Sequence, residues 1–225
     1  MKKKTIAELK EDIITICKLM HKKGYVAATD GNVSVKIHEN LFAITPAGFN
    51  KGLITSNDLI TIDSEGTIVS GKHKASSEFL MHLKAYSLRP DIGAVVHAHP
   101  PHLTAFSIAG FEIPQDMLPE VVLTIGSIPT SDYATPSTPE VAMVIEDLIK
   151  KHDAITLNRH GSLTVGKDLF SAYNKLEKIE HTAHVTLIAK SLGKIQLLDE
   201  DKLEKLTFLA HKLGIRKDLN PQDSD

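Results

Sequence analysis

Hydrophobic residues recur with helical spacing in the first part of the chain. Thr5 and Glu8 form a capping-box pattern that is typical of a helix start, and Gly24 marks the end of the helix. One face of this predicted helix carries apolar side chains: Ile6, Leu9, Ile13, Ile16, Cys17 and Met20. Because Cys17 lies on that face, we expect it to be a core residue rather than a catalytic thiol.

Between residues 25 and 69 the pattern changes to short runs of the β type. Residues 33–37 and 41–45 alternate between apolar and polar, and residues 59–62 and 67–69 are two further candidate strands. Turn residues separate these runs at positions 30–31, 39–40, 46–48 and 65–66. This order predicts an antiparallel meander.

The rest of the chain alternates between helical and extended patterns. Strands are expected over residues 94–97, 121–125, 154–157 and 162–165, and helices over residues 76–88, 103–108, 139–151, 168–192 and 200–213. The helix over residues 76–88 is expected to bury Phe79, Leu80 and Leu83. The order of elements favours one α/β domain over residues 1–225, with a central, mainly antiparallel or mixed sheet between helices. Its core is expected over about residues 5–213, and a polar tail follows residue 216.

The composition narrows the class of protein. The chain has 225 residues with 26 Lys and Arg against 28 Asp and Glu, and this balance argues against a basic nucleic-acid-binding or membrane-binding surface. Cys17 is the single cysteine, which excludes an internal disulfide and favours a reducing compartment. No apolar run approaches the roughly 20 residues of a membrane span, and no apolar signal core follows the basic residues 1–4. We therefore expect a cytoplasmic protein with no nucleic-acid or membrane partner.

Among twelve histidines, the pair His97 and His99 gives the sharpest chemical signal. Residues i and i+2 of a strand point to the same face, so the two imidazoles would form half of a metal site at a strand end. Catalytic zinc sites typically use three protein ligands. His160, in a turn after the apolar run at residues 154–157, is the candidate for the third ligand. Taken alone, each of these histidines is more typical of an ordinary turn than of a metal site.

Glu78 is a further candidate because it stands at the start of a predicted helix. Three roles are consistent with a carboxylate there: a charge that complements the helix dipole, a metal ligand, or a general acid or base.

The sequence signals of the other histidines are weaker. His181 and His184 form i,i+4 pairs with Glu177 and Glu180, which are usually solvated contacts on a helix face. His102 is close enough in sequence to line the same pocket as His97. The remaining histidines are expected at the surface: His21, His38, His73, His82, His152 and His211.

Three polar turns indicate a site for an anion. The turns at residues 29–32 (TDGN) and 46–48 (PAG) offer backbone and side-chain donors. Ser76 and Ser77 stand before a helix, where hydroxyl and free N–H groups bind phosphate readily. No Walker A or G-x-G-x-x-G motif is present, so a nucleotide cofactor is not indicated.

Together these segments resemble the class II aldolase and adducin family, which includes sugar-phosphate aldolases, epimerases and dehydratases. Six segments follow the family's order and spacing across residues 5–195: 29–34 (TDGNVS), 44–48 (ITPAG), 76–78 (SSE), 97–100 (HAHP), 133–135 (YAT) and 159–161 (RHG). The resemblance implies a three-layer α/β/α domain that assembles as a homotetramer.

The resemblance also implies the site and the reaction. Zn²⁺, or another divalent ion such as Mn²⁺, Co²⁺ or Fe²⁺, would be held by His97, His99 and His160, with Glu78 as ligand or as base. The phosphate would be bound by Thr29, Gly31, Asn32, Gly48, Ser76 and Ser77. The implied reaction cleaves a ketose 1-phosphate of the fuculose 1-phosphate kind into dihydroxyacetone phosphate and an aldehyde, through a metal-stabilised enediolate.

The chain departs from the family pattern at several positions. Ala47 replaces a hydroxyl residue of the fuculose aldolases, so one phosphate hydrogen bond is lost or is replaced with help from Lys51. Glu78 stands where the epimerases usually carry aspartate, which favours an aldolase. The aldolase tyrosine that protonates the aldehyde oxygen has no match, and Glu120 occupies a place like that of the dehydratase's acid/base glutamate.

Glu120 is therefore a second candidate catalytic residue, with an ordinary surface carboxylate as the alternative. With Glu120 as second acid or base, a dehydratase, decarboxylase or 4-epimerase acting on a sugar phosphate is the alternative to the aldolase. A metal-free interaction module like the adducin head domain is disfavoured, because such a module has no need to retain His97, His99, His160 and Glu78.

Overall fold

A seven-stranded sheet forms the centre of the structure, a computed structural model in which residues 4–215 are described. The strands are β1 (Asn32–His38), β2 (Leu41–Ile44), β3 (Ile60–Asp63), β4 (Ile68–Ser70), β5 (Ala94–Ala98), β6 (Ala154–Leu157) and β7 (Gly161–Gly166). Their spatial order is β4-β3-β2-β1-β5-β7-β6, and every neighbouring pair is antiparallel. The first four strands form the predicted meander.

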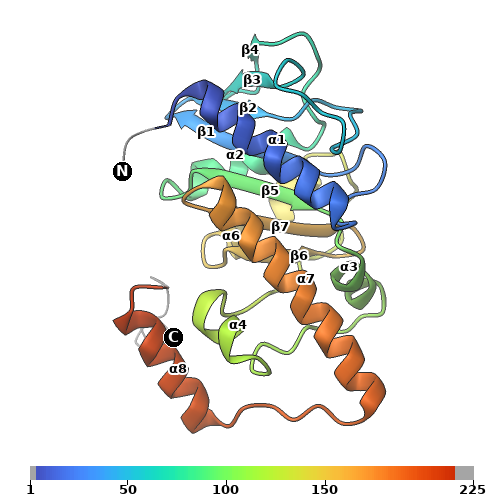
Figure 1. The fold of residues 1–225 in the computed structure, drawn as a ribbon, viewed down its shortest axis with the longest axis vertical. Coiled ribbons are helices and arrows are strands. Elements are labelled where there is room, and N and C mark those ends of the chain that lie inside the picture. The colour runs from blue at the N-terminus through green and yellow to red at the C-terminus, as the bar shows by residue number, and fades with distance from the viewer. Residues whose placement is uncertain (1–3, 216–225) are drawn as a thin grey trace.

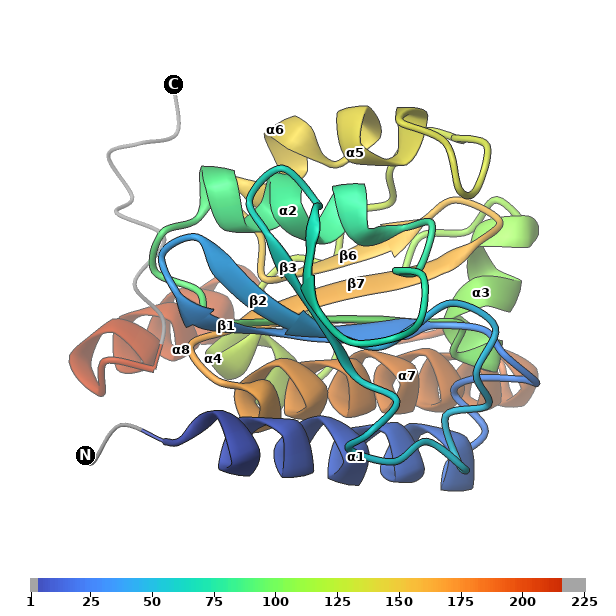
Figure 2. The same cartoon turned by 90° about the horizontal axis from the view of Figure 1, so that it is seen from above.

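Helices cover both faces of this sheet (Figure 1). They are α1 (Ile6–Lys22), α2 (Phe79–Leu88), α3 (Pro101–Ile108), α4 (Pro119–Thr124), α5 (Glu140–Val144), α6 (Glu146–Ile149), α7 (Leu169–Leu192) and α8 (Glu200–Lys212). Figure 2 shows α1 and α7 side by side on one face, and α2, α5 and α6 on the other. The predicted three-layer α/β/α architecture is therefore confirmed.

The two faces of the sheet have separate apolar cores, because side chains alternate along each strand. On β5, Val96 packs in the core beneath α1 and α7, whereas Val95 packs in the core beneath α2. His97 shares the α2 face with Val95. On the neighbouring β1, Asn32 and Ser34 also point to that face, since their side chains contact residues at the start of α2 and within it. A strip of polar side chains thus enters an otherwise apolar layer.

Two predicted elements are wrong. Residues 121–125, predicted as a strand, lie mostly in the helix α4, which has Pro119 in its first turn and is followed by Gly126 with a φ of +77°. A short apolar run has the same appearance in a buried strand and in a buried helical turn, so its periodicity does not separate the two. The single helix predicted over residues 139–151 is two short helices, α5 and α6, which meet at Ile145.

Helix α2 begins at Phe79 rather than at residue 76. Phe79 and Leu83 of the predicted apolar side pack against the core, but the fully buried residues lie beside them and Leu80 points outward. The buried residues of the helix are Met81, His82, Ala85 and Tyr86, whereas Leu80 is 38% exposed. The expectation that His82 lies at the surface is wrong. His82 is buried because its Nδ1 lies 2.7 Å from Oγ of Ser34, which gives the imidazole a polar partner inside the layer.

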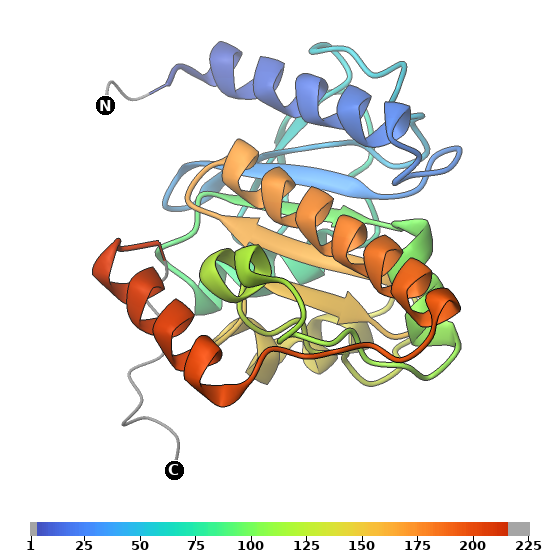
Figure 3. The same cartoon turned by 60° about the horizontal axis from the view of Figure 1, so that its bottom comes forward.

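The C-terminal helix α8 packs against α4 at one end of the molecule (Figure 3). The chain that leads to it is tied to the loop before α4 by a hydrogen bond from the Leu198 N–H to the Asp116 carbonyl at 2.8 Å. The polar tail predicted after residue 216 lies outside the described residues, and the single-domain organisation of residues 1–225 stays a prediction. Over residues 4–215, no helix combines the length and the apolar character that a membrane crossing requires.

Candidate functional site

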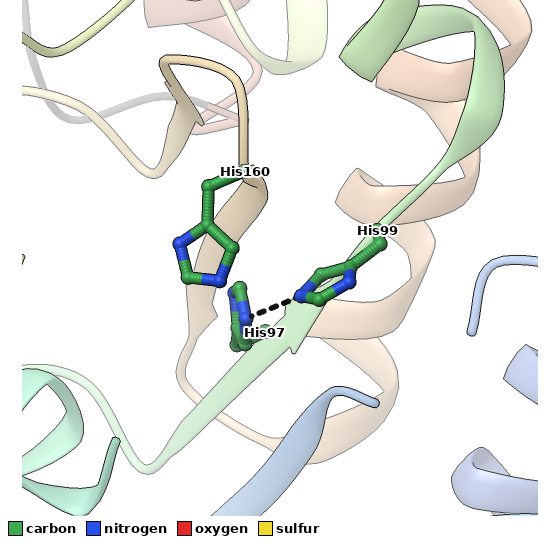
Figure 4. Close-up of side chains that lie close together, drawn as sticks. All are labelled: His97, His99 and His160. Atoms are coloured by element: carbon green, nitrogen blue, oxygen red, sulfur yellow. Dashed lines mark hydrogen bonds between the residues drawn. The ribbon is translucent and has the colours of Figure 1, made fainter. Parts of the chain in front are cut away.

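Three imidazoles meet at one end of the sheet (Figure 4). His97 is the next-to-last residue of β5, and His99 directly follows that strand. His160 lies in the turn between β6 and β7. The Nε2 atoms of His97 and His99 are 3.0 Å apart, and one ligand nitrogen from each of the three rings lies within 4.8 Å of the others. The structure thus brings together the three histidines that were grouped from the sequence.

Close backbone packing positions His160. Arg159 adopts the left-handed conformation with a φ of +57°, which tightens the turn between β6 and β7. A Cβ atom on Gly161 would lie 2.2 Å from the Ala98 carbonyl oxygen and 2.9 Å from Cδ2 of His99. Glycine is therefore required for the approach of this turn to β5, and that approach brings His160 to the other two imidazoles.

Glu78 completes the cluster from the helix layer that contains α2. It occupies the N-cap position of α2, yet its side chain makes no capping hydrogen bond. Instead Oε2 lies 3.2 Å from Nε2 of His97, and Oε1 lies 3.1 Å from Nε2 of His160. Both carboxylate oxygens therefore face the histidines, which is an arrangement suited to a metal ligand or to an acid/base group and unlike that of a capping carboxylate.

Asn32 holds Glu78 in this orientation. Its Nδ2 donates to Oε2 of Glu78 at 2.8 Å and to Oγ of Ser76 at 3.1 Å. Asn32 is also the strand partner of His97 in the β1–β5 ladder. The chain enters β1 through Gly31, which has a φ of +72° and where a Cβ would lie 2.9 Å from the His97 carbonyl oxygen. The approach of β1 to the cluster therefore depends on glycine at position 31.

Groups outside the cluster orient the imidazole rings. Nδ1 of His97 lies 2.9 Å from the Ser162 carbonyl oxygen, which only accepts, so Nδ1 carries the hydrogen and the Nε2 lone pair faces the centre. Nδ1 of His99 lies 3.5 Å from Oδ2 of Asp30. Metal-binding histidines typically place their second nitrogen against a carbonyl or a carboxylate in this way.

The electrostatics of the cluster favour the ligand forms of Glu78 and His99. Burial raises the pKa of Glu78, but the neighbouring imidazoles of His97 and His160 outweigh burial and hold that pKa well below its usual range. Burial lowers the pKa of His99 to about 3, and the two other imidazoles act in the same direction. For His97, burial is outweighed by the Glu78 carboxylate, so the pKa is raised. Glu78 is therefore ionised and His99 neutral at pH 7, as metal binding requires.

The spacing and the chemistry of the donors fit a divalent transition metal. The distances of 3.0, 3.1 and 3.2 Å within the cluster are close to the roughly 3.3 Å between neighbouring ligands of a tetrahedral ion with bonds of about 2.0 Å. Three imidazoles with a carboxylate suit Zn²⁺ and also accept Mn²⁺, Co²⁺ or Fe²⁺. The residues present can therefore hold a divalent metal ion.

A cavity of about 300 Å³ lies beside the cluster. The six residues proposed from the sequence as phosphate ligands all line it: Thr29, Gly31, Asn32, Gly48, Ser76 and Ser77. Glu78, His99 and His160 line it as well. The three polar turns, which are far apart in the sequence, therefore surround one space next to the histidines.

Ser137 also lines this cavity, although it belongs to none of the segments that predicted the site. The Ser77 hydroxyl donates to Oγ of Ser137 at 2.7 Å, and Ser137 adopts a φ of +65° in the loop before α5. This contact joins residues 60 positions apart. The sequence contains no spacing signal for it, since it depends on how the loop folds over α2.

Two other candidates lie apart from the cavity. Glu120 is exposed on α4 and is absent from the cavity wall. His102 is paired elsewhere: its Nδ1 lies 2.7 Å from Oε1 of Glu180, and its ring stacks on His184 with centroids 4.1 Å apart. Glu180 is buried and accepts the backbone N–H of His102 and of Leu103, so it caps α3 and is not the solvated residue expected from the sequence.

The fold and the site define a member of a known class. The chain belongs to the class II aldolase and adducin N-terminal domain family, whose pattern matches residues 11–187. The resemblance inferred from the six sequence segments is therefore confirmed. The protein is an enzyme of the class II aldolase type.

The relatives that match this chain include aldolases and a decarboxylase. An L-fuculose phosphate aldolase of Methanococcus maripaludis is 36% identical over 181 residues, which cover 80% of this chain and 97% of the relative. A 3-oxo-tetronate 4-phosphate decarboxylase of Haemophilus influenzae is 28% identical over 201 residues, which cover 88% and 95%. The solved structure of an L-fuculose 1-phosphate aldolase matches with a TM-score of 0.84 and 28% identity, covering 93% of this chain and 99% of that chain.

Proposed function

We propose that the protein is a divalent-metal-dependent aldolase that cleaves a ketose 1-phosphate, of the fuculose 1-phosphate kind, into dihydroxyacetone phosphate and an aldehyde. The observation that carries this proposal is the convergence of His97, His99, His160 and Glu78 at the wall of a polar cavity. Similarity to relatives named L-fuculose phosphate aldolase supports the same substrate class. Zinc is the ion we propose first, because it favours three imidazole ligands.

The cavity suits the phosphate end of such a substrate. Gly31 and Gly48 have φ values of +72° and +74°, and glycine at both turns lets a ligand approach the backbone closely. Ser76 and Ser77 add hydroxyl groups and the N–H groups that precede α2. Binding of the phosphate there fixes the distance from the phosphate to the reacting carbons, so that these carbons meet Glu78 in one geometry.

When bound by these residues, a divalent ion would act as a Lewis acid on carbonyl and hydroxyl oxygens of the substrate. The net cleavage moves one proton from the hydroxyl of the aldehyde half to the carbon of the dihydroxyacetone phosphate half. We assign the transfer at carbon to Glu78, which Asn32 orients through the 2.8 Å hydrogen bond. Its low pKa keeps the carboxylate ionised, which is the form that accepts a proton in the reverse, condensing direction. In the cleavage direction Glu78 first takes up a proton from solvent and delivers it to the carbon, and the proton that leaves the hydroxyl returns to solvent.

We propose Glu120 for the second proton transfer, at the hydroxyl oxygen. The same residue would serve as the second acid or base of the dehydratase, decarboxylase or 4-epimerase alternative, so the reaction products and not Glu120 separate these activities from the aldolase. This residue is exposed and does not line the cavity of its own chain. The assignment therefore depends on the homotetramer expected from the sequence, because α4 of a neighbouring subunit would have to bring Glu120 to this cavity. The cytoplasmic location expected from the composition stays a prediction of the sequence.

A second candidate function uses the same site. The 28% identity to a 3-oxo-tetronate 4-phosphate decarboxylase favours a decarboxylase as the alternative, since loss of CO₂ also leaves an electron pair on a carbon next to a carbonyl group. The products distinguish the two reactions.

The test is a coupled assay for dihydroxyacetone phosphate with a panel of ketose 1-phosphates, run on the metal-loaded protein with and without a chelator. Release that the chelator abolishes is the expected result. A His97→Ala variant serves as the matched negative control, and metal content is measured on every sample. No release from protein that contains its metal overturns the aldolase proposal. Evolution of CO₂ from 3-oxo acid phosphates by the same sample then identifies the decarboxylase.

A further inference from the structure

Lys51 is the largest fully buried side chain of the described residues, with 1% of its surface exposed. Its Nζ donates to the Thr29 carbonyl oxygen at 2.9 Å and to the Phe49 carbonyl oxygen at 2.7 Å. Within residues 4–215 it has no ion-pair partner. A buried ammonium without a carboxylate partner is costly, so its retention calls for a physical reason.

The two carbonyl groups belong to the two turns that line the phosphate cavity. Thr29 begins the first turn, which continues through Gly31, and Phe49 directly follows Gly48 of the second turn. One side chain therefore fastens both turns to each other from behind the cavity wall. Lys51 itself is absent from that wall, so we expect no direct hydrogen bond from its ammonium to a phosphate in the cavity.

The charge balance of the cavity gives a second argument. The described residues of the wall include the acidic side chains of Asp30 and Glu78 and no lysine or arginine. The divalent ion of the proposed function balances the charges of these two carboxylates, so a phosphate dianion in the cavity has no compensating charge in the wall, because the hydroxyl and amide donors around it carry no net charge. The buried ammonium of Lys51 lies directly behind the turns, in a medium of low dielectric constant where its field is weakly screened.

We propose that Lys51 is a positioning residue of the phosphate site, a buried cation that holds the two anion-binding turns together and compensates the charge of the phosphate without touching it. This inference rests on the proposed function only in naming the phosphate of a sugar phosphate as the natural occupant. Burial lowers the pKa of Lys51, and Cys17 and the carboxylates of Asp30 and Glu78 oppose that change.

Two substitutions separate the two parts of this role. Lys51→Met keeps the length of the side chain and removes both the charge and the donors, whereas Lys51→Gln removes the charge and retains an amide that donates hydrogen bonds. Lys18→Met is the matched control, because it makes the same change of net charge at an exposed position of α1. The probe is inorganic phosphate, and its binding to the full chain is measured by calorimetry in the metal-loaded protein.

We expect Lys51→Met to weaken phosphate binding by at least about tenfold, Lys51→Gln to weaken it less, and Lys18→Met to leave it unchanged. With an active substrate, the ratio of kcat/KM for the phosphorylated ketose to that for the unphosphorylated ketose should fall in Lys51→Met. A merely structural role would lower both values together. Phosphate affinity in Lys51→Met equal to that of the parent protein overturns the proposal.

Hydrogen exchange on the unmodified protein keeps the proposal testable if the variants do not fold. Phosphate should slow amide exchange in residues 29–32 and 47–50 together, because one side chain joins the two turns. Protection of one turn alone contradicts the proposal. These measurements use binding rather than turnover. A protein whose phosphate binding depends on Lys51 but which releases no triose phosphate would disprove the aldolase activity and leave this inference intact.

Discussion

Asn32 and Glu78 are 46 residues apart in the sequence and meet at 2.8 Å, with the amide Nδ2 of Asn32 donating to Oε2 of the carboxylate. The contact aims Glu78 at His97, which is the strand partner of Asn32. Two layers of the molecule are joined at this point, since Asn32 belongs to the sheet and Glu78 to the start of α2.

Replacement of Asn32 by alanine should reduce turnover while the metal content is kept. Loss of a hydrogen bond to a charged group costs about 1.5–3 kcal/mol, so we expect kcat to fall about 10- to 100-fold. Ser34→Ala is the matched control, because Ser34 lies two residues further on the same face of β1 and contacts His82 and Tyr86 in place of Glu78. Equal losses in both variants would show that Asn32 acts only through the stability of the fold.

Replacement of any one of His97, His99 or His160 by alanine should abolish stoichiometric metal binding. Three-ligand sites lose most of their affinity when one ligand is removed, and chelation of the parent protein should lower its Tm because the ion binds the folded state alone. Metal analysis after gel filtration measures the first effect and differential scanning fluorimetry the second. The exposed His38→Ala is the control. Full metal content in His97→Ala would disprove the assigned metal site.

Replacement of Glu78 by glutamine should leave the fold intact and remove most of the activity. The amide keeps the shape of the side chain but takes up no proton, and the loss of a general acid/base group lowers rates by about 10²–10⁴-fold. Steady-state kinetics and circular dichroism give the two readouts. Rates like those of the parent enzyme would mean that another group moves the proton.

The stability of the protein should decrease as the pH falls below the usual range of histidine, and His82 should account for part of this decrease. Burial lowers the pKa of His82 to about 3, and the nearby His97 acts in the same direction. Between about pH 6.5 and pH 3 the unfolded chain binds a proton that the folded protein excludes, so the free energy of unfolding falls by up to about 1.4 kcal/mol per pH unit. Denaturant titrations at several pH values measure this slope.

The variant His82→Asn should show a shallower slope, because asparagine does not titrate and its amide can still contact Ser34. His38→Asn, at an exposed site, is the control. An unchanged slope in His82→Asn would show that other groups dominate the acid response.

Cys17 should be inert in the native protein. It is fully buried on α1, and burial raises the pKa of its thiol to about 12, so the reactive thiolate is absent near neutral pH. We expect no reaction with a chromogenic disulfide reagent until a denaturant is added, and then one thiol per chain. Rapid labelling of the native protein would contradict the burial of Cys17 in the core.

Local patterns determine those parts of the protein that depend on neighbours in the sequence. The capping box follows from Thr5 and Glu8 being three residues apart, and the meander of β1 to β4 and the common face of His97 and His99 follow from the period of two residues in a strand. The six family segments also identified the class of enzyme and the residues that line the cavity, because each turn carries its own glycine or hydroxyl side chain.

Tertiary structure alone decided the rest. The face that α2 buries, the burial of His82 beside Ser34 and the helical form of residues 119–124 depend on what packs against each segment, and isolated periodicity allows more than one answer. The contacts of Lys51 with Thr29 and of Ser77 with Ser137 join residues 22 and 60 positions apart. Such contacts arise only when strand register and layer packing bring distant turns to the same end of the sheet, which no local pattern specifies.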